Sequence, residues 1–332
     1  MNKRLRVVLI IAIALPIVWV SVGALLISTP APTFAHEPYP LRPSPSSRHT
    51  CRLDAATRCF SMRDGAVLHA HWFEAGSDTT VVLVHGVMSN ADEMAPTAEG
   101  IRGAASVNVA TLDLRGHGGS QGTFGDIDYI GQYDDDLADV VQAIRKQNPK
   151  SRVILAGHSM GGGIVMRYAA KPAMPLVDGY LLFAPLLGEQ SPTTRTPTAT
   201  PTGQEASFET PLKVHLRRTI GLIMLNSLGI SAFNHLGTLY FNVSADRGRL
   251  FYSFAAMADM APDDYRVALR ADDKPLLLIA GTNDEAFDAK QYPSVVLLHP
   301  NGRAVLVPGA THDGIMRNPA AFSAVATWLQ GR

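Results

Sequence analysis

Six short, continuous apolar runs constrain the fold of this chain more than any other feature. They occupy residues 81–84, 107–112, 153–155, 180–183, 276–279 and 304–307. A strand that faces solvent on one side alternates apolar and polar residues, whereas a strand buried on both faces is apolar throughout. The runs therefore predict a parallel sheet with helices packed on both faces.

Helix-compatible segments lie between these runs. Residues 133–147, 162–170 and 319–329 repeat apolar residues at helical spacing. Upstream, residues 60–73 read as two strands joined at Asp64-Gly65, a dipeptide suited to a tight hairpin turn. Alternating strands and helices are typical of a doubly wound α/β sheet, which binds ligands at the carboxyl ends of its strands.

The N-terminal residues 1–28 are predicted to be a membrane anchor or a signal peptide. Residues 7–27 carry no charge, and as a helix they would span roughly 30 Å, the thickness of a bilayer's hydrocarbon core. Lys3, Arg4 and Arg6 precede this run, which places the body of the chain outside the cytoplasm. The body of an anchored protein is then expected to be periplasmic or extracellular. Cleavage after Ala35 is the alternative, and it would leave a secreted protein.

Residues 29–50 are rich in proline and predict an extended linker. The folded body is then expected to cover residues 51–332. Its two cysteines, Cys51 and Cys59, are the only ones in the chain, and in an oxidising compartment we expect them to form a disulfide. Two unpaired thiols are the alternative.

An insertion interrupts the alternation of strands and helices at about residues 187–273. It begins with a Thr/Pro-rich loop at 192–211 and continues with apolar, helix-compatible segments at 220–228 and 250–260. An insertion of this length between two strands predicts a helical lid over the site.

Ser159 is the predicted nucleophile. It stands in Gly157-His158-Ser159-Met160-Gly161, between a buried-type strand and a helix. In such a nucleophile elbow the turn is so sharp that the flanking residues leave no room for a Cβ atom, and the serine is held in a strained conformation.

A serine hydroxyl needs a base, and the base needs a carboxylate that fixes its tautomer. His312 and Asp284 each follow a predicted strand and complete the order Ser, Asp, His. Glu285 or Asp288 could serve in place of Asp284. The negative charge of the transition state needs two backbone donors, for which we expect the N–H groups of Val87 and Met160.

These motifs resemble the α/β-hydrolase superfamily, in particular its monoacylglycerol lipase, lysophospholipase and serine aminopeptidase branch. The resemblance rests on His85-Gly86, residues 113–120, residues 157–162, residues 281–284 and His312. It implies an α/β-hydrolase fold, a triad of Ser159, Asp284 and His312, and an oxyanion hole at Val87 and Met160. His85, His117 and His158 then shape loops. No metal or organic cofactor is implied.

The formal net charge is zero and charged residues make up 17% of the chain, so nothing predicts a nucleic-acid partner. The expected function is hydrolysis of a carboxylic ester, with a monoacyl lipid as the expected substrate because of the apolar lid and the membrane tether. Two alternatives stay open. One is an exported serine aminopeptidase, with Asp263-Asp264 or Asp272-Asp273 binding the substrate's amine. The other is a membrane-anchored interaction module that has lost its chemistry. The sequence does not indicate an oligomeric state.

Overall fold

The computed structural model describes residues 3–34, 39–40, 56–195, 212–244 and 250–331. Two compact units make up the chain. The larger unit comprises residues 44–124, 130–199 and 259–332, and the smaller unit comprises residues 1–43, 125–129 and 200–258.

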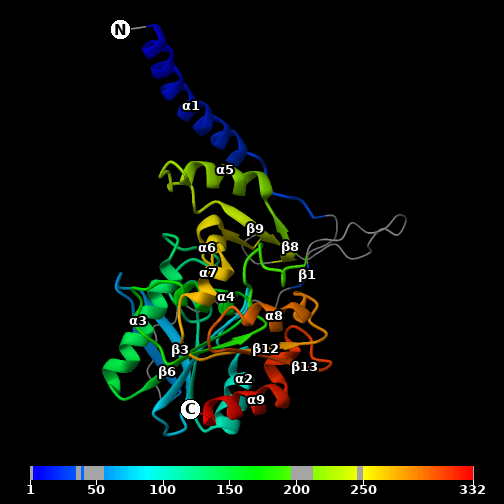
Figure 1. The fold of residues 1–332 in the computed structure, drawn as a ribbon. Coiled ribbons are helices and arrows are strands. Elements are labelled where there is room, and N and C mark those ends of the chain that lie inside the picture. The colour runs from blue at the N-terminus through cyan, green and yellow to red at the C-terminus, as the bar shows by residue number, and fades with distance from the viewer. Residues whose placement is uncertain (1–2, 35–38, 41–55, 196–211, 245–249, 332) are drawn as a thin grey trace, which may run out of the picture. The chain divides into compact units, whose positions relative to one another are not determined.

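A mostly parallel sheet organises the larger unit (Figure 1). Within the described residues it has eight strands in the order β13-β12-β7-β6-β4-β5-β3-β2. The antiparallel strands β2 (Thr57–Ser61) and β3 (Val67–Phe73) form one edge, and the other six strands run parallel to one another. These six are β4 (Thr79–Val84), β5 (Asn108–Leu112), β6 (Arg152–His158), β7 (Gly179–Phe183), β12 (Leu276–Gly281) and β13 (Gly302–Val307).

The predicted strands and hairpin are confirmed. Each of the six apolar runs overlaps one of the parallel strands, and β4, β5 and β7 are buried at every position. The turn between β2 and β3 contains Gly65 with φ of 87°, a conformation that glycine adopts without steric cost.

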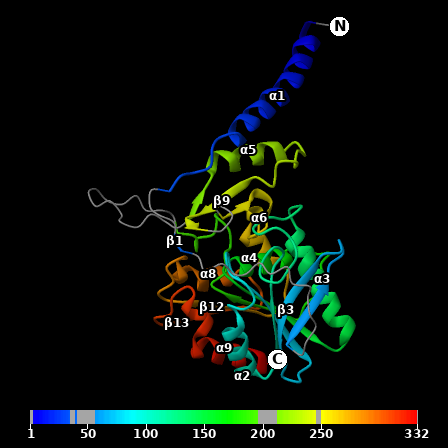
Figure 2. The same ribbon diagram turned by 180° about the vertical axis from the view of Figure 1, so that it is seen from behind.

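Helices cover both faces of this sheet (Figure 2). The helices of the larger unit are α2 (Ala95–Ala105), α3 (Gln132–Gln147), α4 (Met160–Ala169), α7 (Tyr265–Arg270), α8 (Tyr292–Val296) and α9 (Pro319–Gln330). On one face, Ile101 of α2 and Trp328 of α9 share a buried cluster with Leu83, Ile154 and Phe183. Residues that alternate with these along the strands are buried on the opposite face, where α3 and α4 pack.

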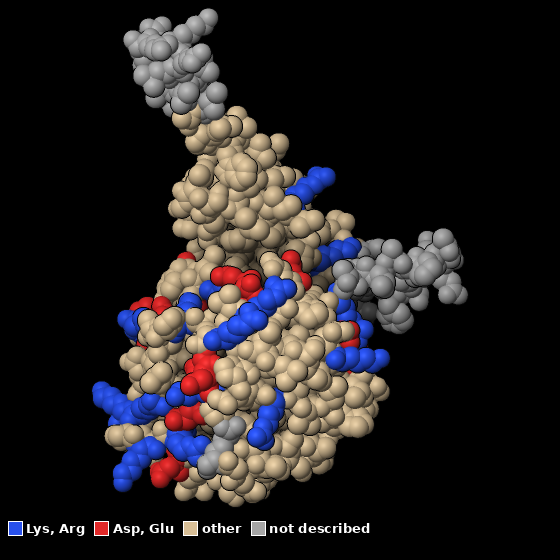
Figure 3. All heavy atoms as spheres, in the orientation of Figure 1, with Lys and Arg blue, Asp and Glu red and all other residues tan. Residues whose placement is uncertain are grey.

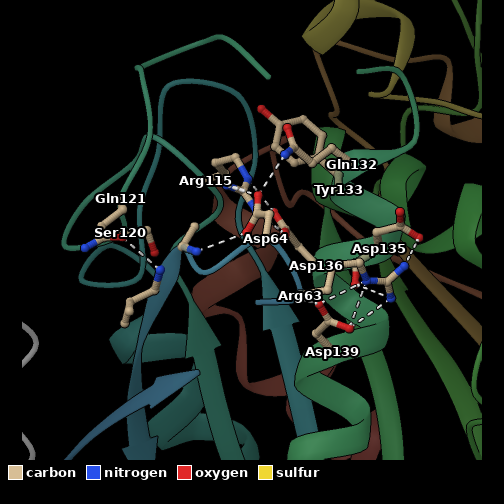
Figure 4. Close-up of polar contacts among 12 residues, drawn as sticks. Arg63, Asp64, Arg115, Ser120, Gln121, Gln132, Tyr133, Asp135, Asp136 and Asp139 are labelled. Atoms are coloured by element: carbon tan, nitrogen blue, oxygen red, sulfur yellow. Dashed lines mark hydrogen bonds and ion pairs between the residues drawn. The ribbon is translucent and has the colours of Figure 1, made fainter. Parts of the chain in front are cut away.

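An ion-pair network joins the hairpin turn to α3 (Figure 4). Arg115 contacts Asp136 at 2.6 Å and Asp64 at 2.9 Å, and Arg63 contacts Asp139 at 2.9 Å. Burial raises the pKa of Asp136 to about 6 despite its hydrogen bonds from Arg115. The network fixes the loop that follows β5, because Arg115 belongs to that loop.

Within the described residues, the smaller unit combines three helices with short strands. It contains α1 (Lys3–Ile27), α5 (Leu216–Asn226) and α6 (Phe254–Ala258), and an antiparallel sheet in the order β11-β9-β8. These strands are β8 (Leu212–Val214), β9 (Gly237–Phe241) and β11 (Phe251–Ser253), and the two-residue strands β1 (Tyr39–Pro40) and β10 (Val243–Ser244) pair with each other.

The expectation of a helical insertion is met only in part, because the insertion contains strands as well as helices. The segment 220–228 largely coincides with α5, but the segment 250–260 begins as β11 before it becomes α6. Short runs of β-branched and aromatic residues, such as those in β9, pair with neighbours that are distant in the sequence, and helical spacing does not reveal such pairing.

Several N-terminal predictions remain untested. In the described part of the chain, no helix combines the length and the apolar character that a membrane crossing requires. Most of the predicted linker at 29–50 and of the Thr/Pro-rich loop lies outside the described residues, as does Cys51. Cys59 in β2 is disulfide-bonded, and its pairing with Cys51 stays a prediction.

Candidate active site

Ser159 lies in the sharp turn between β6 and α4. Its backbone has φ of 53° and ψ of −116°, a strained conformation for a residue with a side chain. A Cβ atom added to Gly157 would lie 2.3 Å from the carbonyl carbon of Gly161, and one added to Gly161 would lie 2.3 Å from the carbonyl oxygen of Val84. The two glycines therefore make the turn possible, as the sequence predicted.

His312 and Asp284 are joined by a hydrogen bond. Nδ1 of His312 lies 3.0 Å from Oδ2 of Asp284. The other carboxylate oxygen of Asp284 accepts backbone N–H groups from Ala286 at 2.9 Å and Phe287 at 2.8 Å. Burial alone would raise the pKa of Asp284, but the hydrogen bonds from His312 and these backbone groups hold that pKa below its ordinary value. Asp284 is therefore a buried, ionised acceptor for the imidazole.

The alternative carboxylates make other contacts. Glu285 accepts the backbone N–H of His312 at 3.0 Å rather than the ring. Asp288 accepts the backbone N–H of Lys290 and the side chain of Gln291. Of the three acidic residues that the sequence left open, Asp284 is the one bonded to the imidazole.

Ser159 and His312 line one cavity of about 600 Å³. Its walls are formed by Gly86, Val87, Met88, Ser89, Glu93, Met94, His158, Ser159, His312, Asp313, Gly314, Met316 and Arg317. Among the described contacts, no hydrogen bond joins the Ser159 hydroxyl to Nε2 of His312. In enzymes without bound substrate such bonds are often long and tighten only when substrate binds.

The two expected oxyanion donors flank Ser159 in different ways. Met160 is the first residue of α4, so its N–H has no partner within the helix. Val87 lines the cavity and follows Gly86, where an added Cβ would lie 3.3 Å from the Cβ of Ser159. No described hydrogen bond occupies either N–H, so both are available to a ligand.

The three histidines that precede His312 in these motifs are buried and shape loops, as predicted. His85 and His117 each bond a nearby carbonyl oxygen through Nδ1. Nε2 of His158 lies 3.1 Å from the carbonyl oxygen of His312. Burial lowers the pKa of all three, to about 3 for His117 and His158, so these rings are neutral.

One group of side chains near the cavity could hold a metal ion. Within the described residues, His158, His312 and Asp313 each offer one ligand atom, and these atoms lie within 4.8 Å of one another. His312 already bonds Asp284 through Nδ1. A metal bound here would therefore compete with the role expected of this histidine as a base.

The acidic pairs suggested for an aminopeptidase lie elsewhere. Asp264 caps α7, and Asp263 lies 3.5 Å from Arg167. Asp272 and Asp273 line a separate cavity of about 440 Å³. None of the four lines the cavity of Ser159, so this assignment of an amine-binding site is wrong.

Sequence reasoning missed several residues near the site. Nη2 of Arg195 donates to the carbonyl oxygen of Asp284 at 2.7 Å, which braces the loop that carries the carboxylate. Met88, Met94 and Met316 form much of the apolar wall of the cavity, and Glu93 supplies a carboxylate. No local motif marks any of these residues, because their role depends on long-range packing.

The sheet, the elbow and the loops at the strand ends define an α/β-hydrolase. Among solved structures, the chain is similar to Est1E from Butyrivibrio proteoclasticus with bound ferulic acid, with a TM-score of 0.58 and 18% identity, covering 82% of this chain and 98% of that one. An esterase from Pyrococcus furiosus gives a TM-score of 0.53 and 19% identity, covering 83% and 90%. At these identities the likeness concerns the fold.

The model of the serine aminopeptidase S33 family matches residues 75–316. The chain belongs to this family and is a serine hydrolase of the α/β-hydrolase superfamily. It is 37% identical over 91 residues to a monoacylglycerol lipase of Mycolicibacterium smegmatis, covering 27% of this chain and 32% of that protein. A dihydrolipoyllysine-residue acetyltransferase component of an acetoin cleaving system from Pseudomonas putida is 32% identical over 122 residues, covering 36% and 30%. The chain thus aligns with only about a third of each of these relatives.

Proposed function

We propose that this protein hydrolyses carboxylic esters through an acyl-enzyme on Ser159. The observation that carries the proposal is the Asp284–His312 hydrogen bond beside a strained serine, with both Ser159 and His312 on the wall of one cavity. This arrangement fits a nucleophile and a base, with a carboxylate that orients the base.

The reaction has two halves. Nε2 of His312 takes the hydroxyl proton as Ser159 attacks the ester carbonyl, and the N–H groups of Val87 and Met160 stabilise the oxyanion. The tetrahedral intermediate collapses, and His312 returns the proton to the departing alcohol. A water molecule then gives a proton to His312 and attacks the acyl-serine. As the bond to Ser159 breaks and the carboxylic acid leaves, His312 returns that proton to Oγ of Ser159. Asp284 holds the tautomer in which Nδ1 carries the proton.

We propose a monoacyl lipid as the substrate class. Val87, Met88, Met94 and Met316 give the cavity an apolar wall, and unbranched methionine side chains adapt to flexible chains. The size of the cavity is within the range typical of small-molecule sites. The match to a monoacylglycerol lipase supports the same choice over the aligned segment.

The membrane location belongs to this proposal as well. The uncharged residues 7–27 after Lys3, Arg4 and Arg6 favour an anchor with the catalytic body outside the cytoplasm. Such an anchor would hold the site near its lipid substrates. Protease digestion of intact and lysed cells tests the orientation, since a body outside the cytoplasm is digested without lysis.

The nucleophile is tested with p-nitrophenyl esters of short and long acyl chains. We expect the wild-type protein to hydrolyse them and Ser159→Ala to lose this activity, and equal activity of the two proteins would contradict the proposal. A fluorophosphonate probe should label wild type at Ser159. Absence of labelling in a folded protein would favour the interaction module instead.

An aminopeptidase is the second candidate, favoured by the family description and by two carboxylates on the cavity wall, Glu93 and Asp313. A protonated amine of a substrate could pair with either of them. Comparison of amino-acid anilides with esters separates the two functions. If anilides are the better substrates and Glu93→Gln raises their KM, the aminopeptidase is the correct assignment.

A further inference from the structure

The helix α5 of the smaller unit has apolar residues on two opposite faces. On its inner face, Leu222 and Leu225 are buried in a cluster with Ile27 of α1 and Phe254 of α6. Its outer face carries Leu216, Ile220 and Ile223, which are 65%, 43% and 54% exposed. The spacing of these three residues places them on one stripe, opposite the inner face. A helix that is apolar on both sides indicates a second partner for its outer face.

The helix α1 packs closely against α5 within this unit. A Cβ added to Gly221 would lie 2.7 Å from the carbonyl oxygen of Gly23, so the two backbones approach where both residues are glycine. Nε1 of Trp19 donates to the carbonyl oxygen of Met224 at 2.9 Å. Small residues at a helix crossing, with side chains that bond across it, are typical of helix pairs in lipid.

The C-terminal end of α1 is also bonded to α5. Arg218 donates to the carbonyl oxygens of Ile27 at 3.2 Å and Thr29 at 2.8 Å. These bonds satisfy carbonyl groups that the end of a helix leaves without partners. The second half of α1 is therefore part of the folded unit.

An exposed apolar stripe on α1 adds to the outer face of α5. It consists of Leu15, Val18, Val22 and Leu25, which recur at helical spacing and are all exposed. Beyond α5, Leu228 and Phe233 are exposed as well. Together with Leu216, Ile220 and Ile223, these residues form what we call the α1/α5 surface.

The segments that form the α1/α5 surface carry no acidic residue, although Asp126 of the same unit pairs with His235 at 2.8 Å. Residues 12–34 and 212–244 contain no Asp or Glu, whereas Lys213, Arg217 and Arg218 lie in or beside α5. Arg217 is exposed. Figure 3 shows the described surface over α1 and α5 as almost free of charge, with basic side chains beside it. Apolar residues flanked by basic ones suit a bilayer with anionic headgroups.

We propose that the α1/α5 surface docks on a lipid membrane, with α5 lying along the interface and its outer face in contact with acyl chains. A second copy of the chain is a poorer occupant, because it would bring the basic side chains in and beside α5 of the two copies together. The proposal goes beyond the chemistry at Ser159 and does not depend on it.

The test uses the full chain reconstituted into vesicles of phosphatidylglycerol and phosphatidylcholine, the latter brominated on its acyl chains. Ile220→Trp places a fluorophore on the outer face of α5. Leu297→Trp is the matched control, since Leu297 is 77% exposed in the larger unit. Subtracting the wild-type spectrum removes the native tryptophans, and a thermal melt verifies that each variant is folded.

We expect the emission added by Ile220→Trp to be blue-shifted and largely quenched by the brominated lipid, while that of Leu297→Trp is unaffected. Emission at 220 that is quenched by aqueous iodide and not by the lipid would overturn the proposal. Protection of this position in a dimer that forms without lipid would overturn it too, and would assign the surface to a second copy.

Discussion

Asp284 holds the ring of His312 through Nδ1, while its neighbour Glu285 holds the backbone N–H of the same histidine. Two adjacent carboxylates thus contact one residue at two different points. The first contact fixes the tautomer of the imidazole, and the second fixes the position of the loop. This difference separates the expected effects of removing either charge.

Asp284→Asn should therefore be far more damaging than Glu285→Gln. An amide at 284 can favour the wrong tautomer of His312, so we expect kcat on ester substrates to fall by a factor on the order of 10³ to 10⁴ with little change in KM. Glu285→Gln retains an acceptor for the backbone N–H and should cost less than about tenfold. Steady-state kinetics of both variants measures the difference. Equal losses of kcat would show that Asp284 does not fix the tautomer of His312.

The site and the fold were predictable to different degrees from the sequence. Ser159 and the order of its partners follow from local motifs, because a strand, a sharp turn and a helix need glycine at fixed positions. The choice among Asp284, Glu285 and Asp288 does not, because it depends on the turn that directs Ala286 and Phe287 toward one carboxylate.

Long-range packing explains what the sequence did not predict. Arg195 reaches Asp284 from a segment 89 positions away. Of the methionines of the cavity wall, Met88 and Met94 belong to the loop between β4 and α2, and Met316 comes from more than 200 residues further along the chain. The sheet of β8, β9 and β11 is similarly assembled from short strands that look unremarkable one by one.

Added Zn²⁺ should inhibit the protein, and EDTA should leave its activity unchanged. The proposed mechanism uses only protein groups, so chelation removes nothing that it needs. Zn²⁺ bound by His158, His312 and Asp313 would withdraw His312 from its role as base. Asp313 is exposed, so Asp313→Asn should retain basal ester hydrolysis and weaken the inhibition by about tenfold. Inhibition that is identical in this variant would place the Zn²⁺ elsewhere.

The stability of the protein should fall as the pH rises from about 4 to 7, because of a buried carboxyl group in the larger unit. Burial, together with nearby Asp134, raises the pKa of Asp259 from its ordinary value of 3.8 to about 7, although Arg167 opposes this shift. A carboxyl group whose pKa is raised by folding contributes its full stabilisation below its unfolded pKa. This contribution is lost as the pH rises through the folded pKa. In Asp259→Asn, the stability should depend less on pH in this range.

Urea unfolding at a series of pH values measures this effect. Asp263→Asn is the matched control, since Asp263 also contacts Arg167 but is exposed. It should preserve the wild-type slope. A slope that is unchanged in Asp259→Asn would mean that Asp259 titrates alike in the folded and unfolded chain.

Deletion of residues 1–28 should destabilise α5 and spare the active site. The deletion removes Ile27 from its buried cluster, which alone costs about 2 kcal/mol, and it takes away a carbonyl group that Arg218 bonds. We expect faster hydrogen exchange of the α5 amides in the truncated protein. Fluorophosphonate labelling of Ser159 should persist, because the elbow belongs to the other unit.

Deletion of residues 1–11 is the matched control, because it ends before Trp19 and keeps the contacts of α1 with α5. Its α5 amides should exchange as in the full chain when both are compared in the same detergent. Equal protection of α5 in all three proteins would show that α1 is not needed for the fold of the smaller unit. That result would favour a cleaved signal over a retained helix, because the fold of the smaller unit would then not depend on α1.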